Sequence, residues 1–243
     1  MSPLSAEQLR QFGRDGYLVV PGLVPPDRVT AANAAIDALL VDHVPAPGQH
    51  SIVERPTAQP ELFALVYDTP AFAIAEQLTA PGALTGPTHA QVALTYPPYP
   101  HIPGSGHVDG LNRLRDGRPQ SFTLLVGVLL SDQSADHMGN VHVWPGTHRA
   151  TAEYARTHGI EALFEAAAET SCAPIDQHDR TQVHGRPGDV LFAHYLLAHN
   201  IGGNTSTVVR RTVYMRLTRV GHAEHWRSAF TDELMEFDGV RES

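Results

Sequence analysis

The chain has 243 residues, of which 42% are hydrophobic and 18% are charged, a balance typical of a folded globular protein rather than a disordered one. Its formal net charge of -9 argues against a nucleic-acid partner, which would need a basic surface. The N-terminal residues lack an apolar signal core, and no apolar run is long enough to span a membrane. We therefore expect a cytoplasmic protein with no nucleic-acid or membrane partner.

The first 88 residues show mainly helical patterns. Ser5 and Gln8 have the spacing of a capping box, which predicts a helix that begins after Ser5 and ends near Phe12. Apolar residues at helical spacing and clusters of proline and glycine define the other elements of this half. These are a strand over 16–20, helices over 25–40 and 58–78, and a loop over 42–60.

From His89 onward, short apolar or alternating runs bounded by glycine, proline and asparagine predict strands. A helical stretch over 153–169 interrupts them. Many short strands with turns between them predict a mainly β fold with flanking α-helices: a double-stranded β-helix, or cupin-like jelly roll. We expect one domain over 1–243, with a mostly helical portion at 1–88 packed on a jelly-roll core at 89–220. The strands are expected near 91–95, 107–110, 122–130, 140–144, 183–184, 189–192 and 208–220.

Two histidines and one aspartate give the most specific chemical signal. On a strand, residues i and i+2 point to the same side, so His107 and Asp109 can bind one ion, and His199 can add a ligand from another strand. Two imidazoles and one carboxylate leave half of an octahedral ion open, which is the facial triad of non-haem Fe(II) oxygenases. A bare His-x-Asp pair is a weak signal by itself, and His194 is the nearest competing third ligand.

Four sequence motifs follow one another in the chain. They are the His-x-Asp pair at 107–109, the segment NVHVWPGTH at 140–148, the Gly-Asp-hydrophobic strand at 188–192, and HNIGGN at 199–204 followed by Arg210. In that order they resemble the phytanoyl-CoA dioxygenase family of Fe(II)- and 2-oxoglutarate-dependent oxygenases, and the resemblance covers nearly the whole chain. It implies Fe(II) bound by the three residues above, 2-oxoglutarate as co-substrate, and O2 as oxidant.

The same resemblance implies residues that bind 2-oxoglutarate. Arg210 lies eleven positions after His199 (210 − 199), where the family places the arginine for the distal carboxylate, and guanidinium binds carboxylate through two parallel hydrogen bonds. Strand alternation leaves Arg211 open, because the apolar side of a strand usually faces inward and Arg211 shares that side. Thr95 is a further candidate contact to 2-oxoglutarate. Ile201 departs from the family, which often has serine there.

The implied reaction is hydroxylation of an unactivated C–H bond of a small metabolite, with release of succinate and CO2. Asp109 disfavours halogenation, because related halogenases lack this carboxylate. The alternatives are desaturation, cyclisation or epimerisation at the same iron centre, a non-catalytic metal- or sugar-binding jelly roll, and a Zn(II) hydrolase with the same ligands. Residues 43–60 and 96–106 are expected to line the substrate site. Neither the substrate nor the oligomeric state follows from the sequence.

Overall fold

The computed structural model describes residues 3–41, 45–112 and 114–241. Within them the helices are α1 (Ala6–Asp15), α2 (Pro26–Leu39), α3 (Pro60–Tyr67), α4 (Ala71–Leu78), α5 (Thr147–His158), α6 (Ile160–Thr170), α7 (His222–Thr231) and α8 (Asp238–Arg241). The strands are β1 (Tyr17–Val20), β2 (Gly48–Glu54), β3 (Leu84–Thr85), β4 (Ala90–Tyr96), β5 (Leu114–Arg115), β6 (Arg118–Pro119), β7 (Leu124–Leu129), β8 (Val141–Val143), β9 (Thr181–Gln182), β10 (Val190–His194), β11 (His199–Ile201) and β12 (Arg210–Arg219).

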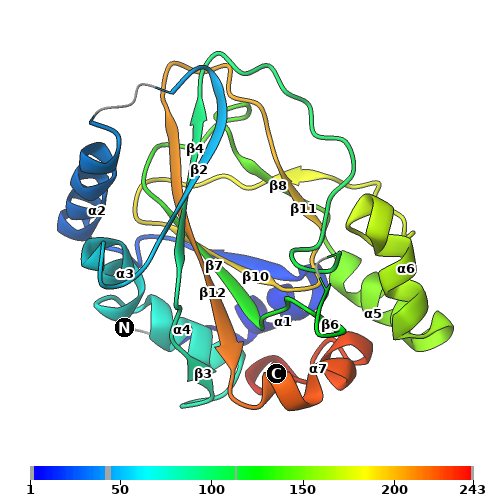
Figure 1. Cartoon of the computed structure of the whole chain (residues 1–243). Helices are drawn as coiled ribbons and strands as arrows, with labels where there is room; N and C mark the ends of the chain where they lie inside the picture. Colours follow the sequence, from blue (N-terminus) through cyan, green and yellow to red (C-terminus); the bar gives the residue numbers. More distant parts are fainter. Residues whose placement is uncertain (1–2, 42–44, 113, 242–243) are drawn as a thin grey trace.

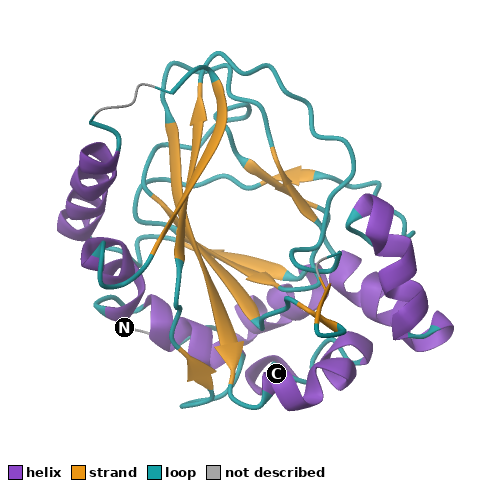
Figure 2. Ribbon diagram, in the orientation of Figure 1, coloured by secondary structure: helices purple, strands orange, loops and turns teal. Residues whose placement is uncertain are grey.

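Two antiparallel sheets form the centre of the fold (Figure 1). The large sheet has the order β1-β10-β7-β12-β4-β2, with β3 paired to β12, and the small sheet has the order β11-β8-β9. Figure 2 shows the described helices outside the two sheets, with none of them between the sheets. The predicted jelly roll with flanking helices is therefore confirmed. None of the helices in the described ranges is long and apolar enough to cross a lipid bilayer.

The helices of the first half follow the sequence patterns closely. The capping box is present, since Ser5 Oγ accepts a hydrogen bond from the Gln8 amide and Gln8 Oε1 accepts one from the Ser5 amide. The helix predicted over 25–40 is α2, and the stretch 58–78 forms the two helices α3 and α4. This half is not only helical, because β1 and β2 are the two edge strands of the large sheet.

The loop predicted over 42–60 was wrong in part. Residues 48–54 form β2, which pairs with β4 along its whole length, whereas 42–44 lie outside the described residues. The prolines of this region flank the strand and do not interrupt it. The strand is polar because it lies at the edge of the sheet, so it lacks the apolar alternation that would have identified it.

Three predictions for the second half also need correction. Residues 107–110 do not form a strand; His107 makes a single bridge to His199, and a turn follows it. The strand expected at 183–184 lies two residues earlier, as β9. The helix expected over 153–169 is the pair α5 and α6, which Gly159 separates with φ at +90°. The C-terminal helices α7 and α8 were not predicted.

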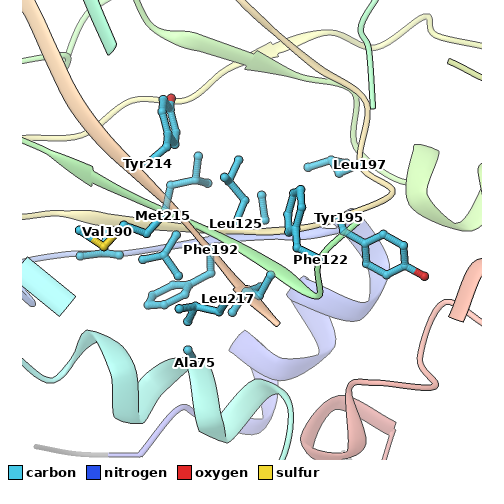
Figure 3. Close-up of a cluster of buried hydrophobic side chains, with 14 of the residues drawn as sticks. Ala75, Phe122, Leu125, Val190, Phe192, Tyr195, Leu197, Tyr214, Met215 and Leu217 are labelled. Atoms are coloured by element: carbon cyan, nitrogen blue, oxygen red, sulfur yellow. The ribbon is translucent and has the colours of Figure 1, made fainter. Parts of the chain in front are cut away.

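The core lies between the large sheet and the helices that cover its outer side. On β12 the side chains of Val213, Met215 and Leu217 are fully buried, and full burial of such a side chain contributes roughly 1.5–3 kcal/mol. Figure 3 shows Leu217 and Phe192 on the side of the sheet that faces Ala75 of α4, while Tyr214 points to the other side. The apolar face of β12 therefore attaches the sheet to the helices, and its alternate residues face the small sheet.

A buried carboxylate connects the C-terminal helices to this sheet. Glu236 is 1% exposed, and its carboxylate is hydrogen-bonded to His222 Nδ1 at 2.9 Å, His225 Nε2 at 3.0 Å and Thr123 Oγ1 at 2.8 Å. Burial alone would raise the pKa of Glu236, but the bonds from His222, Thr123 and His225 hold it below its usual value. The ionised carboxylate thus stabilises the attachment of α7.

Glu236→Gln should lower the free energy of unfolding by about 2 kcal/mol, seen as a fall in Tm of about 4–8 °C for a chain of this size. Because the pKa of Glu236 is lowered in the folded protein, its contribution is complete above the ordinary pKa of 4.5 and is lost as the pH falls through the folded value. Calorimetry should therefore show a higher Tm for wild type than for the variant at pH 7, and this difference in Tm should shrink below pH 4.5. Glu224→Gln, an exposed change on α7, is the control; a pH-independent difference would contradict this account.

Candidate metal centre and its cavity

His107 and His199 are brought together by their own backbones. The His107 amide donates to the His199 carbonyl at 2.9 Å, and the His199 amide donates to the His107 carbonyl at 3.0 Å. Residues that exchange both hydrogen bonds in an antiparallel pair are directly opposite, with side chains on the same face. The two imidazole rings accordingly lie with their centroids 4.6 Å apart.

Asp109 completes a cluster of three potential ligands. Its Oδ1 lies 3.4 Å from His107 Nε2 and 3.8 Å from His199 Nε2. One ligand atom from each of the three residues lies within 4.8 Å of the others, and the described part of the chain contains no other such group of three. The three predicted ligands are therefore together, although His107 and Asp109 come from a bridge and a turn rather than from a regular strand.

The hydrogen bond at the far side of the His199 ring sets its orientation. Nδ1 of His199 lies 3.0 Å from the Leu197 carbonyl, which can only accept, so Nδ1 carries the proton. Burial lowers the pKa of His199 and favours the neutral ring. The Nε2 lone pair therefore faces the cluster, as a metal ligand requires.

Asp109 is held as a carboxylate. Burial alone would raise its pKa, but the contacts with His107, His199 and Arg216 outweigh that effect and hold the pKa well below the usual range. Arg216 Nε donates to Asp109 Oδ2 at 3.1 Å, and Arg216 Nη2 also donates to this oxygen. One oxygen of Asp109 thus faces the imidazoles and the other faces a guanidinium.

The segment that carries His107 and Asp109 is fixed by the loop after α6. The Gly106 amide donates to Gln177 Oε1 at 2.6 Å, and the Val108 amide donates to the Ser171 carbonyl at 2.8 Å. Gly110 ends the segment with φ at +74°, and a Cβ there would lie 2.1 Å from the Gln120 carbonyl oxygen. Only glycine fits this turn, so the backbone leaves the cluster directly after Asp109.

The cluster lies in a cavity between the two sheets. Its lining residues come from β2, β4, β7 and β12 of the large sheet, from β8 and β11 of the small sheet, and from the 107–109 segment. They are Gln49, Gln91, Ala93, His107, Asp109, Leu125, Val141, His199, Asn200, Ile201, Arg210, Tyr214 and Arg216. Of the two regions expected to line the substrate site, 43–60 contributes Gln49, and 96–106 contributes no residue to this cavity.

Arg210 is a buried cation in this cavity. It is 1% exposed, and no carboxylate within the described ranges pairs with it. Its Nη2 donates to the Tyr214 hydroxyl at 2.6 Å, its Nη1 to the Ala93 carbonyl at 3.3 Å, and its Nε to Gln133 Oε1 at 3.4 Å. Because a buried charge is normally paired, this guanidinium is suited to an anionic ligand.

The competing residues lie elsewhere. Arg211 points to the opposite side of β12, where it pairs with Asp37 of α2 at 2.7 Å. His194 is buried, and its Nε2 lies 2.7 Å from the Glu233 carbonyl. Thr95 is paired with Arg210 across the sheet; its hydroxyl is buried with no hydrogen-bond partner among the described residues, and it does not line the cavity.

Three features of the site were not predicted from the sequence: the contacts of Tyr214 and Gln133 with Arg210, and the contact between Arg216 and Asp109. Tyr214 and Arg216 lie four and six positions after Arg210 (214 − 210 and 216 − 210), so strand alternation places all three on one face. That signal was available once Arg210 was assigned to the inner side. Gln133 lies on a loop, and no pattern in the sequence indicates its contact with Arg210.

Known proteins similar to this chain include ectoine dioxygenases and solved structures whose names mention 2-oxoglutarate or α-ketoglutarate. No family model matches the chain. It is 23% identical over 267 residues to an ectoine dioxygenase from Streptomyces anulatus, covering 99% of this chain and 86% of the relative. Two crystal structures have the same fold. One is HygX from Streptomyces hygroscopicus with nickel and 2-oxoglutarate bound, at 18% identity and a TM-score of 0.62, covering 88% of this chain and 87% of that chain. The other is SnoK, a non-haem α-ketoglutarate-dependent carbocyclase from nogalamycin biosynthesis, at 23% identity and a TM-score of 0.62, covering 89% of this chain and 87% of that chain.

Gln177→Ala should loosen the segment that carries two of the clustered side chains, because it removes the acceptor for the Gly106 amide. Loss of one such bond costs about 1 kcal/mol, which corresponds to roughly fivefold faster local opening. Hydrogen exchange measured by mass spectrometry should therefore accelerate over residues 105–109 and stay unchanged over β4. Gln182→Ala, which removes the acceptor for the His137 amide, is the matched control, and equal acceleration at 105–109 in both variants would refute this role.

Proposed function

We propose that the chain, whose motifs resemble the phytanoyl-CoA dioxygenase family of Fe(II)- and 2-oxoglutarate-dependent oxygenases and which is similar to ectoine dioxygenases, hydroxylates a C–H bond of a small polar metabolite. In this proposal His107, Asp109 and His199 bind the metal, and Arg210 binds the distal carboxylate of 2-oxoglutarate. One observation carries it: a buried guanidinium without an anionic partner in the described chain lines the same cavity as a three-residue ligand cluster.

The donor set suits the metal. Two imidazole nitrogens and one carboxylate oxygen form the donor set of the facial triad of non-haem Fe(II) oxygenases, and Asp109 is ionised and His199 neutral, as ligands must be. When bound, Fe(II) and 2-oxoglutarate supply the oxidation: O2 converts C–H to C–OH while 2-oxoglutarate becomes succinate and CO2.

The protein's own residues provide position and shielding. The Leu197 carbonyl fixes the His199 ring, and Tyr214 and Gln133 hold the Arg210 guanidinium in place. Arg210 then determines which way the diacid lies, because a planar guanidinium accepts a carboxylate in one orientation. Apolar side chains from both sheets cover parts of the cavity wall and keep water from the reacting centre, namely Ala93, Leu125, Val141 and Ile201.

Other oxidative outcomes on the same centre are the second candidate. A carbocyclase and an epimerase are among the solved structures with this fold, so the ligand set does not select hydroxylation by itself. Product analysis separates these outcomes. Ectoine is a reasonable first substrate to test, since the relatives carry its name. A role for Thr95, a single domain and a cytoplasmic location stay predictions.

The proposed function predicts that the protein forms succinate from 2-oxoglutarate. Incubated with Fe(II), O2, 2-oxoglutarate and its substrate, the purified protein should release succinate and hydroxylated product in equal amounts. A panel of small polar metabolites that includes ectoine would be scored by mass spectrometry. Asp109→Ala should lower succinate formation by more than about 100-fold, because it removes a ligand of the metal. Equal turnover without O2, or with Zn(II) alone, would contradict the proposal.

Arg210→Gln and Arg211→Gln form a matched pair for the co-substrate site. Arg210→Gln should weaken 2-oxoglutarate binding to the Ni(II)-loaded protein by about 10- to 100-fold, because it removes a charge-assisted pair of hydrogen bonds. Arg211→Gln should leave this affinity within about twofold, since Arg211 pairs with Asp37 on the other side of the sheet. Isothermal titration calorimetry measures both; the opposite ranking would move the anchor to Arg211.

A further inference from the structure

Arg216 lies where the cavity of the ligand cluster meets two further hollows. It lies on the same face of β12 as Arg210, and together with Gln91 it lines the cavity of the ligand cluster and both hollows that adjoin it. Its side chain is 37% exposed, so a molecule in this space can reach it. A substrate that approaches the metal cluster through these hollows passes this guanidinium.

Arg216 shares its carboxylate partner, Asp109, with the two histidines of the ligand cluster. Asp109 Oδ2 accepts from its Nε at 3.1 Å and also from its Nη2, while Gln91 Oε1 accepts from its Nη1 at 3.1 Å. The Phe122 ring lies below the guanidinium, with 5.5 Å between its centroid and Cζ. The carboxylate that neutralises Arg216 is thus the same one that faces His107 and His199.

The charges in this space do not balance once the site is loaded. Among the described residues that line the three hollows, the carboxylate and guanidinium groups are Asp109, Arg210 and Arg216. A divalent ion and a dianionic 2-oxoglutarate cancel each other. Two guanidinium cations then face one carboxylate, Asp109, which leaves one positive charge without a partner. An uncompensated cation in a partly buried site is unfavourable, so the loaded cavity lacks one anion.

We propose that Arg216 binds a carboxylate of the substrate beside the metal centre, with Gln91 alongside; this inference rests on the proposed function. The walls around Arg216 fit a small polar acid rather than a long acyl chain. Side-chain amides and hydroxyls line the hollow that it borders, from Gln91, Asn112, Gln120, Ser51 and Ser171. Gln91 is itself held by its amide, which donates to Ser51 Oγ at 3.2 Å, so its carbonyl oxygen orients Arg216 toward the hollow.

A positioning role is the rival explanation. If Arg216 served only to hold Asp109 in place, removing it would weaken metal binding and would not affect an added carboxylate. If Arg216 binds substrate, removing it frees Asp109 from a competing cation, so metal affinity stays or rises while carboxylate binding is lost. The two explanations therefore predict opposite results for Arg216→Gln: loss of metal affinity in one case, and loss of carboxylate binding in the other.

The test uses two small probes on the full chain loaded with Mn(II) and saturating 2-oxoglutarate. Acetate carries the carboxylate, and acetamide has nearly the same shape without charge. Paramagnetic relaxation of their methyl protons reports how often each probe lies near the metal. In wild type the enhancement for acetate should exceed that for acetamide by about tenfold, as expected for a charge-assisted bond. Arg216→Gln should lower the acetate value to that of acetamide.

Two further variants control this result. Arg216→Lys keeps the charge without the planar fork, and should retain part of the acetate preference. Arg227→Gln makes the same change of charge at an exposed arginine that pairs with Glu161 outside the cavity, and should behave as wild type. Mn(II) and 2-oxoglutarate affinities are measured on every sample.

Each outcome decides the matter. Equal enhancement for acetate and acetamide in wild type, with Mn(II) and 2-oxoglutarate bound, would overturn the substrate role of Arg216 and leave the proposed function intact. Weaker Mn(II) binding by Arg216→Gln, with acetate enhancement unchanged, would assign Arg216 to the positioning of Asp109. Failure of wild type to bind Mn(II) or 2-oxoglutarate would overturn the proposed function and this inference together.

Discussion

The two backbone hydrogen bonds exchanged by His107 and His199 are the interaction on which the rest of the site depends. They join residues that are far apart in the chain and place both imidazoles on one face. Because peptide groups set this distance, the rings meet without help from an ion. Asp109 follows two positions later, and the glycine turn after it directs the chain away. The ligand geometry is therefore a property of the backbone.

The two faces of strand β12 have different roles: one contributes to the packed core, and the other lines the cavity. One face packs against the helices, and the other lines the cavity with Arg210, Tyr214 and Arg216. Adjacent arginines thus have opposite surroundings: Arg211 pairs with Asp37 of α2, whereas Arg210 is buried next to neutral groups. A central strand between β7 and β4 is a rigid base for these side chains.

The jelly roll and the His107–Asp109 pair were predictable because their signals are local: strand runs, turn residues and a short His-x-Asp spacing. His199 is distant in the chain, and its assignment rested on the resemblance of the HNIGGN segment to the family. Strand alternation could not choose between Arg210 and Arg211, and the family spacing from His199 was the reason to prefer Arg210. Alternation separates two faces of a strand but does not say which one lines a cavity. The usual rule, apolar side inward, fails here because the apolar side of β12 is covered by helices and the polar side faces the cavity.

Contacts between distant segments could not be predicted from the sequence either. The pairing of Arg216 with Asp109 and the bond from Gly106 to Gln177 depend on how loops return to the sheet, which residue spacing does not encode. Edge strand β2 was also missed, since a polar edge strand has no apolar alternation. Sequence reasoning thus gives the chemistry of the ligands, and the structure adds the charges that surround them.

A crystal structure of the protein with Fe(II) and 2-oxoglutarate, grown without oxygen, tests the central claim most directly. The account predicts a single iron bound by His107, Asp109 and His199, with the distal carboxylate of the diacid on the Arg210 guanidinium. An iron bound elsewhere, or a diacid whose far end lies on Arg216 or points to solvent, would contradict it.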